Sequence, residues 1–380
     1  LALGGDPQDV DMASAAPPGE VERLFERTFA VGKAFGTVVV HLHGHDVQVT
    51  TFRTEAGYSD RRRPDSVAWG ASVEEDAGRR DFTCNALYLD PQTDELADPT
   101  GGLADVESRL LRCVGDANER FREDGLRLVR LARFAAALGF DVDPAALRAA
   151  RDNRQALDGV SRERVAEELR RILTRGGSAR ALRLLDELRL LERLFPAFAG
   201  LPGQREARWA ALEVLAPAPG FEPGLSVLFD PAPGGVAPGG PRLERSERLL
   251  EGLRLSRLVR RTVAELWRLQ SEARQVLAQD HPSRAHRIRL VRDPSWPDAE
   301  RVLRAWQSTM GEAPAALDAL DAFAASLSEH QLRPEPYLRA SDLADAGVPR
   351  GPRWGQLLDE AEALQLEGLH ASREPALDWL

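Results

Sequence analysis

Two aspartates one residue apart are the first side chains of this chain that could do chemistry. Asp9 and Asp11 lie in the opening stretch LALGGDPQDVDMAS, just after a Gly-Gly pair. On a β-strand both carboxylates would face the same way, because side chains alternate with a period of two. Oxygen ligands of this kind suit Mg²⁺, which shares its coordination sphere with substrate phosphates. The spacing predicts a magnesium site for phosphoryl chemistry, and two exposed turn acids are the alternative.

A third metal ligand is expected from the strand DVQVTTFR (46–53). Gln48 occupies the favoured place there, and an amide is a poorer magnesium ligand than a carboxylate. Asp46 lies two residues earlier and therefore on the same face. The sequence leaves open a site of Asp9 and Asp11 alone or one completed by Asp46. The alternating His41, His43 and His45 mimic a transition-metal site, but they fall at a predicted hairpin tip and are interpreted as solvated turn residues.

The elements that must position these groups change in character near residue 105. Before it, two β-branched runs around His43-Gly44 predict a hairpin over 37–53, preceded by a short helix in VERLFERTFA. Residues 55–70 are polar and predict a loop, and FTCNALYLD predicts a strand. After it, amphipathic spacing predicts helices over 125–140, 161–174 and 179–195. The Pro/Gly-rich stretch 216–243 predicts a linker or a long surface loop.

Composition and charge exclude several classes of protein. The 380 residues carry a net charge of −10, and Lys33 is the only lysine among many arginines. No apolar run is long enough to span a membrane, so no membrane partner is expected. Cys84 and Cys113 stand far apart, which argues against a disulfide framework and for the cytoplasm. The acidic total does not exclude RNA, which responds to local arginine clusters.

Several longer segments carry a family resemblance. EEDAGRRDFTCNALYLD (74–90) and REDGLRLVRLARFAAALGF (122–140), together with DPQDVDMAS and VTTFRTEAGYSDRRRPD, resemble the bacterial class II tRNA nucleotidyltransferases. This family includes CCA-adding enzymes and their poly(A) polymerase relatives. The resemblance covers roughly the first 175 residues. It implies an α+β fold, with a small mixed nucleotidyltransferase head followed by an all-α neck, body and tail. The corresponding ranges are 1–104, 105–175, 176–335 and 336–380.

The resemblance also implies roles for individual residues. Asp124 and Arg127 match the pair that reads the incoming base, and their spacing predicts one helical face. A carboxylate accepts from the exocyclic amine of cytosine or adenine, while a guanidinium donates to the adjacent ring nitrogen. Uracil and guanine would leave these charges unpaired. Further nucleotide-binding residues implied by the family motifs are Arg79, Arg80, Asp81, Asn85, Arg130 and Arg133. For Arg133 and for Arg164 of the neck, a structural role is an equal alternative.

A flexible loop and the opening glycines bear on activity. Tyr58, Asp60, Arg61 and Arg62 match a loop associated with adding the terminal A. In the family, the Gly-Gly that grips the triphosphate precedes the metal aspartates by a helix, for which Gly4-Gly5 leaves no room. Gly4-Gly5 is therefore interpreted as a turn. We expect the chain from Leu1 to bind tRNA but to catalyse poorly, which a comparison with a version extended upstream would test.

The sequence thus predicts a Mg²⁺-dependent enzyme that adds CCA, or only the final A, to tRNA 3′ ends from CTP and ATP. No obligate protein partner is implied, apart from a separate CC-adding enzyme in the A-only case. SDLADAGVPRGPRWGQLLDEAEALQLEG (341–368) resembles the tail of tRNA enzymes more than that of poly(A) polymerases. A poly(A) polymerase and a non-catalytic RNA-binding relative, favoured by Gln48, remain as alternatives.

Overall fold

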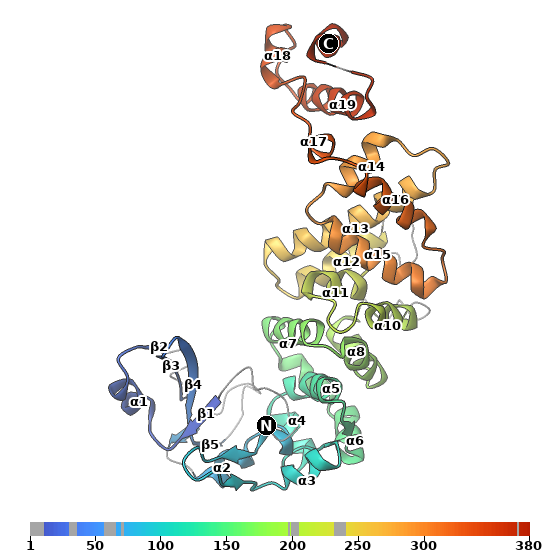
Figure 1. The fold of residues 1–380 in the computed structure, drawn as a ribbon. Coiled ribbons are helices and arrows are strands. Elements are labelled where there is room, and N and C mark those ends of the chain that lie inside the picture. The colour runs from blue at the N-terminus through green and yellow to red at the C-terminus, as the bar shows by residue number, and fades with distance from the viewer. Residues whose placement is uncertain are drawn as a thin grey trace. The chain divides into compact units, whose positions relative to one another are not determined.

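The computed structural model describes residues 11–29, 36–56, 66–69, 72–196, 198, 205–231, 241–370 and 372–380. Asp9, the Gly4-Gly5 pair and the predicted loop residues Tyr58, Asp60, Arg61 and Arg62 lie outside them. The chain divides into two compact units, Leu1–Gly200 and Leu201–Leu380. The predicted fold class is confirmed, because a small sheet is followed by helices (Figure 1). The four ranges predicted for head, neck, body and tail stay a prediction.

A four-stranded sheet carries the first predicted ligand. Its order is β1-β4-β3-β2, with β1 parallel to β4 and the other pairs antiparallel. Val21 of α1 packs with Val38, Val40 and Val49 on one face. Asp11 pairs in register with Gln48, whose side chain must point to the opposite face because Val49 points to the α1 face. The strands and helix are β1 (Asp11–Ser14), α1 (Pro18–Leu24), β2 (Thr28–Phe29), β3 (Thr37–Leu42) and β4 (His45–Thr51).

The predicted hairpin is confirmed, with its turn at His43-Gly44. Both residues have positive φ, +50° and +84°, as a tight two-residue β-turn requires. His41 and Asp46 face each other across the hairpin, and His41 Nδ1 lies 2.7 Å from Asp46 Oδ1. Among the described residues, no three histidine, cysteine or acidic side chains cluster as metal ligands would.

Two head predictions are wrong in part. The 55–70 segment is not all loop, because β5 (Arg53–Ala56) pairs with β6 (Ser66–Trp69). FTCNALYLD forms a 3-10 helix at Thr83–Asn85, and only Tyr88–Leu89 is a strand. At this turn the Thr83 hydroxyl donates to buried Asp105 at 2.7 Å, a tertiary contact that the local sequence does not reveal. The surrounding elements are α2 (Val73–Gly78), β7 (Tyr88–Leu89), β8 (Leu96–Ala97), α3 (Gly102–Glu107) and β9 (Leu110–Leu111).

Helices complete the first unit. The predicted helix over 125–140 is α5, which ends at Gly139 with φ +68°, and that over 161–174 is α7. The predicted helix 179–195 is two helices, because Arg189 adopts φ +56° between them. The elements are α4 (Ala117–Glu123), α5 (Leu126–Leu138), β10 (Asp141–Val142), α6 (Pro144–Asp152), a 3-10 helix (Arg154–Gly159), α7 (Arg162–Thr174), α8 (Ser178–Glu187) and α9 (Leu190–Leu194).

The described part of the second unit is helical, and its core lies between α13, α15 and their neighbours. The prediction that 216–243 lacks helices is wrong for Phe221–Leu228, which forms the buried helix α11. Pro223 is tolerated there since it lies in the first turn, where no intrahelical N–H bond is lost. The helices are α10 (Arg205–Val214), α11 (Phe221–Leu228), α12 (Pro241–Gly252), α13 (Arg257–Leu277), α14 (Arg284–Val291), α15 (Trp296–Met310), α16 (Ala315–Ala325), α17 (Glu329–Leu332), α18 (Ala340–Asp345), α19 (Arg353–Glu367) and α20 (Arg373–Trp379).

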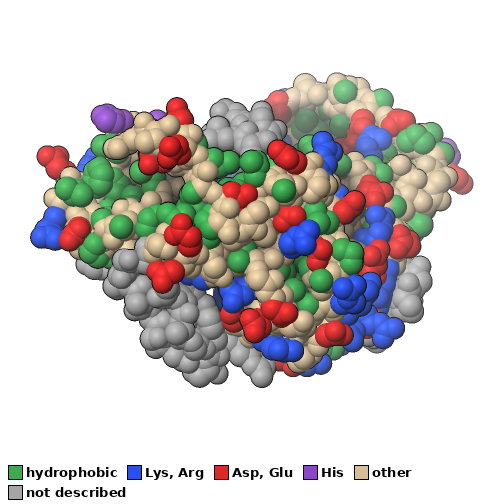
Figure 2. Space-filling model, turned by 90° about the horizontal axis from the view of Figure 1, so that it is seen from below, with side chains coloured by type: hydrophobic (Ala, Val, Ile, Leu, Met, Phe, Trp, Pro, Cys, Tyr) green, Lys and Arg blue, Asp and Glu red, His purple; other side chains and the backbone are tan. Residues whose placement is uncertain are grey.

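Many arginines on the surface of the described residues pair with acidic side chains. Figure 2 shows basic and acidic side chains interspersed over one face of the described surface. Arg268 pairs with Glu265 and Glu272, and Arg304 pairs with Glu300 and Asp318. Such exposed pairs contribute little stability and leave little unbalanced charge. Among the described helices, none is both long and apolar enough to cross a bilayer.

Candidate nucleotide-binding site

A cavity of about 470 Å³ in the first unit brings most of the predicted site residues together. Five arginines and three aspartates line it, so its lining carries an excess of positive charge. This charge suits a phosphorylated ligand, and the volume lies within the usual range for small-molecule sites. The lining residues are Asp11, Arg79, Arg80, Asp81, Asn85, Asp124, Leu126, Arg127, Arg130, Phe134 and Arg164.

Asp124 does not lie on a helical face with Arg127, so that predicted geometry is wrong. It caps the C-terminus of α4 in an extended conformation, and Gly125 is the N-cap of α5. A side chain at Gly125 is excluded because a Cβ would lie 2.2 Å from the Ala156 carbonyl oxygen. The helical spacing therefore breaks at the residue that joins the two helices. The cavity nevertheless receives both side chains.

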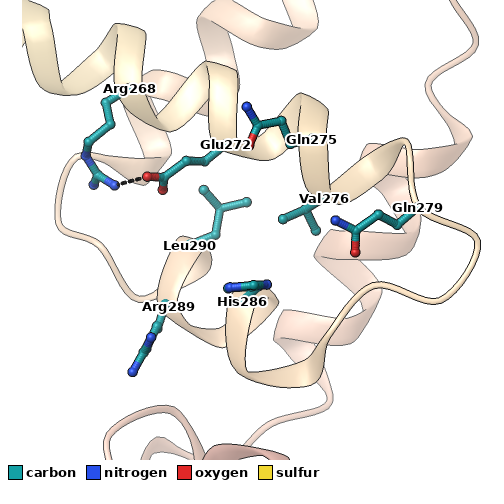
Figure 3. A pocket seen from close by; sticks show the side chains of 8 residues that line it. All are labelled: Arg268, Glu272, Gln275, Val276, Gln279, His286, Arg289 and Leu290. Atoms are coloured by element: carbon teal, nitrogen blue, oxygen red, sulfur yellow. Dashed lines mark hydrogen bonds and ion pairs between the residues drawn. The ribbon is translucent and has the colours of Figure 1, made fainter. Parts of the chain in front are cut away.

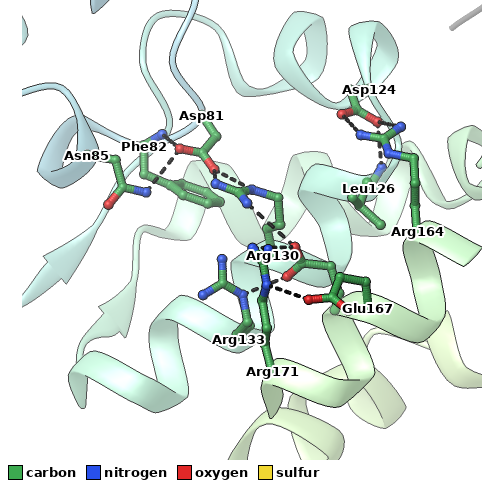
Figure 4. A network of polar contacts seen from close by, with 11 residues as sticks. Asp81, Phe82, Asn85, Asp124, Leu126, Arg130, Arg133, Arg164, Glu167 and Arg171 are labelled. Atoms are coloured by element: carbon green, nitrogen blue, oxygen red, sulfur yellow. Dashed lines mark hydrogen bonds and ion pairs between the residues drawn. The ribbon is translucent and has the colours of Figure 1, made fainter. Parts of the chain in front are cut away.

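Arg164 of α7 holds the Asp124 carboxylate. Its Nη1 donates to Oδ1 at 3.1 Å and its Nη2 to Oδ2 at 2.6 Å (Figure 4). The backbone N–H of Leu126 also donates to Oδ1, at 3.0 Å. Each carboxylate oxygen can accept about two hydrogen bonds. Among the described residues, Oδ1 is thus filled and Oδ2 keeps one open acceptor position.

Arg127 is held by three acceptors. Its Nη1 donates to Glu123 Oε2 at 2.5 Å and to the Arg120 carbonyl oxygen at 3.1 Å. Its Nη2 donates to the Arg79 carbonyl oxygen at 2.9 Å. In the part of the chain that the structure describes, the Nε–H and one Nη2–H remain without an acceptor. One open acceptor on Asp124 and two open donors on Arg127 therefore line the same cavity.

Asp81 braces the cavity rather than offering it a free oxygen. Its Oδ1 accepts from the Phe82 N–H and from Asn85 Nδ2 at 2.9 and 3.0 Å, and its Oδ2 accepts from Arg130 Nε at 2.7 Å and pairs with Arg130 Nη2 at 2.6 Å. All four acceptor positions are filled. Burial opposes ionisation of Asp81, but Arg130 and Asn85 outweigh it and hold the pKa of the carboxyl below its ordinary value.

Arg130 is oriented from two sides. It pairs with Asp81, its Nη1 lies 3.5 Å from Glu168 Oε1, and its guanidinium lies over the Phe134 ring at 5.1 Å. Burial opposes the charge on Arg130, yet the two carboxylates raise its pKa. Arg133 does not line the cavity. It donates to Glu168 at 2.6 Å, and both side chains are buried. A contact of this kind is what we expect if Arg133 has a structural role.

A buried carboxylate that the sequence did not single out orients Arg79 and Arg80. Asp76 accepts from Arg79 at 2.6 Å, from Arg80 at 3.0 Å and from the Tyr88 hydroxyl at 2.7 Å. Burial disfavours its charge, but the arginines and Tyr88 keep the pKa of Asp76 below its ordinary value. Burial also raises the pKa of Tyr88 to about 12, so its hydroxyl remains a donor. Asp76 lies on α2, about one helical turn before Arg79 and Arg80. This spacing was the sequence signal that could have identified it.

Asp11 lines the cavity from β1, and the side chain opposite it is Gln48. The exposed carboxylate and the amide oxygen are hard donors of the kind that Mg²⁺ binds. Asp46 is engaged with His41 at the hairpin. Asp9, the second predicted ligand, lies outside the described residues.

A second cavity, of about 490 Å³, lies in the helical second unit (Figure 3). Its charged lining is already paired, because Arg268 bonds to Glu272 at 2.6 Å and Arg289 to Glu362 at 2.8 Å. Gln275, Gln279 and His286 supply its remaining polar groups.

Sequence comparison finds two families that match parts of the chain, and both concern polymerases of the poly A type. Residues 1–112 match the poly A polymerase head domain, and residues 139–201 match the probable RNA and SrmB-binding site of polymerase A. The first part of the chain is therefore similar to a poly A polymerase head domain.

The more particular relatives are CCA-adding enzymes. The enzyme of Geobacillus stearothermophilus is 42% identical over 226 residues, which are 56% of this chain and 55% of that one. That of Lacticaseibacillus paracasei is 48% identical over 172 residues, 45% of this chain and 43% of that one. The predicted resemblance is confirmed: the chain is similar to bacterial CCA-adding enzymes. It spans about half the length of the curated relatives that it matches.

Solved structures extend the likeness over more of the chain. The Bacillus stearothermophilus CCA-adding enzyme in complex with CTP aligns with a TM-score of 0.75 and 29% identity, covering 97% of this chain and 86% of that one. The Thermotoga maritima CCA-adding enzyme complexed with tRNA aligns with a TM-score of 0.63 and 18% identity, covering 99% and 87%. The second likeness shows the fold alone.

Proposed function

We propose that this protein adds nucleotides to the 3′ end of tRNA without a template, using CTP and ATP. The observation that carries the proposal is the pattern of open hydrogen-bonding positions in the first cavity. Asp124 offers one acceptor and Arg127 offers two donors among the described residues. Cytosine presents an amine beside a ring nitrogen and a carbonyl oxygen, and adenine presents an amine beside a ring nitrogen. Both bases complement this pattern.

The two other bases do not complement it. Uracil and guanine present a carbonyl oxygen where Asp124 needs a donor, and an N–H where Arg127 needs an acceptor. A buried charge that loses its partner costs about 1–3 kcal/mol or more per hydrogen bond. Sites built to bond a polar group reject analogues lacking it far more strongly than apolar pockets do. A rigid acid and guanidinium could thus select C and A without a complementary strand.

The reaction assigned to the site is nucleotidyl transfer. The 3′-hydroxyl oxygen of the RNA forms a bond to the α-phosphorus of the nucleotide, the bond to the β-phosphate oxygen breaks, and the hydroxyl proton leaves. Pyrophosphate carries away the electron pair of the broken bond. Arg79, Arg80 and Arg130 line the cavity and would bind the triphosphate, since guanidinium groups suit phosphate oxygens. Asp81, with no open acceptor, would act through Arg130.

Mg²⁺ fits the residues present, with Asp11 as one ligand and Asp9 proposed as another. When bound, the metal would favour deprotonation of the attacking hydroxyl and neutralise the leaving pyrophosphate.

Arg133 is assigned a supporting role behind Arg130. The predicted loop residues Tyr58, Asp60, Arg61 and Arg62 favour CCA or A addition over CC addition. We expect a protein with this substrate class to act in the cytoplasm, and its second unit is the proposed tRNA-binding part.

A set of acceptors and nucleotides tests the proposal. Labelled incorporation is measured on tRNA ending before CCA, after CC and after CCA, and on unstructured RNA, with each nucleotide alone. We expect CTP or ATP to enter only the incomplete tRNAs. Asp11→Asn should abolish incorporation, whereas Asp141→Asn, at an exposed carboxylate, should not. ATP incorporation into unstructured RNA would indicate a poly(A) polymerase, which the head match also favours. No incorporation by this chain or by a version extended upstream of Leu1, with RNA still bound, would indicate a non-catalytic relative.

A further inference from the structure

Arg164 forms an ion pair with Asp124, the residue whose carboxylate would read the base. We infer that Arg164 is a positioning residue that sets nucleotide selectivity, because it fixes the Asp124 carboxylate and leaves it a single open acceptor. The inference rests on the proposed function and adds a third residue to the selective pair. Arg164 is also among the lining residues of the cavity, about a quarter exposed.

The contact has the geometry needed to fix a plane. Two guanidinium nitrogens meet two carboxylate oxygens, at 3.1 and 2.6 Å, and such a bidentate pair removes rotation of the carboxylate. The backbone N–H of Leu126, two residues further along the chain, adds a third donor. Asp124 itself lies in an extended joint between two helices, so no helical backbone holds its side chain.

The helix that carries Arg164 is firmly seated. Glu168, one turn further along α7, bonds buried Arg133 of α5 at 2.6 Å. Arg162 of the same helix donates to the Leu194 carbonyl oxygen at 2.7 Å. Arg164 thus projects from a fixed helix toward the joint that holds Asp124. Its function depends on this fixed geometry rather than on charge alone.

Removing the guanidinium would open two further acceptor positions on Asp124. The carboxylate would then keep only the Leu126 N–H among its described donors and could rotate. A rotating carboxylate with three open positions can turn away from a carbonyl oxygen and take water instead. The penalty against uracil and guanine would fall, and the hydrogen bond to cytosine or adenine would weaken.

The experiment compares Arg164→Gln, Arg164→Lys and the control Arg170→Gln. Arg170 lies on the same helix and pairs at the surface with Glu167 at 3.7 Å. Calorimetry gives the Kd of each protein for CTP and UTP, and incorporation assays give the same ratio for activity. We expect Arg164→Gln to lower the UTP-to-CTP ratio of Kd about tenfold, the loss of about one charged hydrogen bond. Arg170→Gln should match the unaltered protein.

Lysine separates geometry from charge. Arg164→Lys keeps the positive charge but cannot form two parallel bonds, so it should lose selectivity nearly as far as Arg164→Gln. Full selectivity in Arg164→Lys would overturn the inference, as would an equal loss of CTP and UTP affinity in Arg164→Gln. Far-ultraviolet circular dichroism checks folding, and if Arg164→Gln does not fold, Arg164→Lys decides.

Failure of the proposed function gives a different result. If the unaltered protein incorporates no nucleotide but still binds CTP more tightly than UTP, the proposed reaction is wrong, and the binding ratios still decide the role of Arg164. If the unaltered protein binds CTP and UTP equally, the inference is overturned, since there is no selectivity for Arg164 to set.

Discussion

Replacing Asp81 with asparagine should destabilise the first unit strongly and in a pH-dependent way. Asp81 is 7% exposed and receives four donors, two of them from Arg130. Asparagine keeps one oxygen and therefore about half of the acceptor positions. It also leaves Arg130 with Glu168, at 3.5 Å, as its nearest remaining carboxylate. Losing one partner of a buried ion pair costs about 3–5 kcal/mol.

Because asparagine retains part of the hydrogen bonding, we expect a loss of about 3 kcal/mol, near the lower end of that range. The pKa of Asp81 is lowered by folding from its ordinary value of 3.8. A lowered carboxyl pKa contributes stability that is fully present above the ordinary value and is lost as the pH falls through the folded value. The two proteins should therefore differ fully at pH 7 and less below about pH 4.

Hydrogen exchange followed by mass spectrometry is the suitable assay. Six of the seven tryptophans lie in Leu201–Leu380, so tryptophan fluorescence would mainly report on the other unit. Amides of α5 that exchange through unfolding of the first unit should exchange about 100-fold faster in Asp81→Asn, because 1.4 kcal/mol corresponds to a factor of ten. Comparison at equal pH cancels the intrinsic exchange rates.

Asp141→Asn is the matched control, since its side chain is 94% exposed and lies 3.5 Å from Arg180. An exposed pair of this kind contributes about 0–1 kcal/mol. Equal exchange in the two variants at pH 7 would refute the reasoning. So would a difference for Asp81→Asn that is as large at pH 3 as at pH 7.

Three further predictions follow from the same contacts. Glu123→Gln removes the charged partner of Arg127 and should weaken CTP and ATP binding about tenfold by calorimetry, whereas Glu119→Gln, exposed on the same helix, should have no effect. Arg208→Met in the second unit leaves the Val227 and Asp230 carbonyl oxygens without their buried donor and should cost about 3 kcal/mol in urea unfolding followed by tryptophan fluorescence; an unchanged midpoint would contradict this. EDTA should abolish nucleotide incorporation and added Mg²⁺ should restore it, while incorporation that survives EDTA would exclude the proposed metal ligands' role.

The elements that the sequence predicted correctly are those specified by local signals. Alternating β-branched residues around His43-Gly44 specify the hairpin, and Gly139 stops α5 where the amphipathic spacing ends. The errors arose where tertiary contacts override local preference. Burial of the Phe221–Leu228 face makes a helix in a Pro/Gly-rich stretch. A left-handed Arg189 breaks a helix whose composition is uniform.

The candidate site shows the same division. The motif residues could be collected from the sequence because they fall in the short segments that carry the family resemblance, and most of them line one cavity. The pairing of these residues could not be predicted, because the ion pair of Asp124 with Arg164 spans forty positions and depends on how α7 packs on α5. The spacing of Asp124 and Arg127 suggested a shared helix, whereas the structure has an extended Asp124 at the joint between α4 and α5. The close approach of Gly125 to Ala156 explains only why the next residue is glycine.

The number of donors on each carboxylate distinguishes the residues that support the cavity from those that could read a ligand. Asp81 has four donors, and Asp76 is enclosed by two arginines and Tyr88, so neither can gain from a bound base. Asp124 has three donors and lacks one. A fixed carboxylate with one open position penalises a carbonyl oxygen and rewards an amine, which a solvated, rotating carboxylate cannot do. Nucleotide choice in a protein without a template strand would therefore depend as much on Arg164, which donates to the Asp124 carboxylate, as on Asp124 itself.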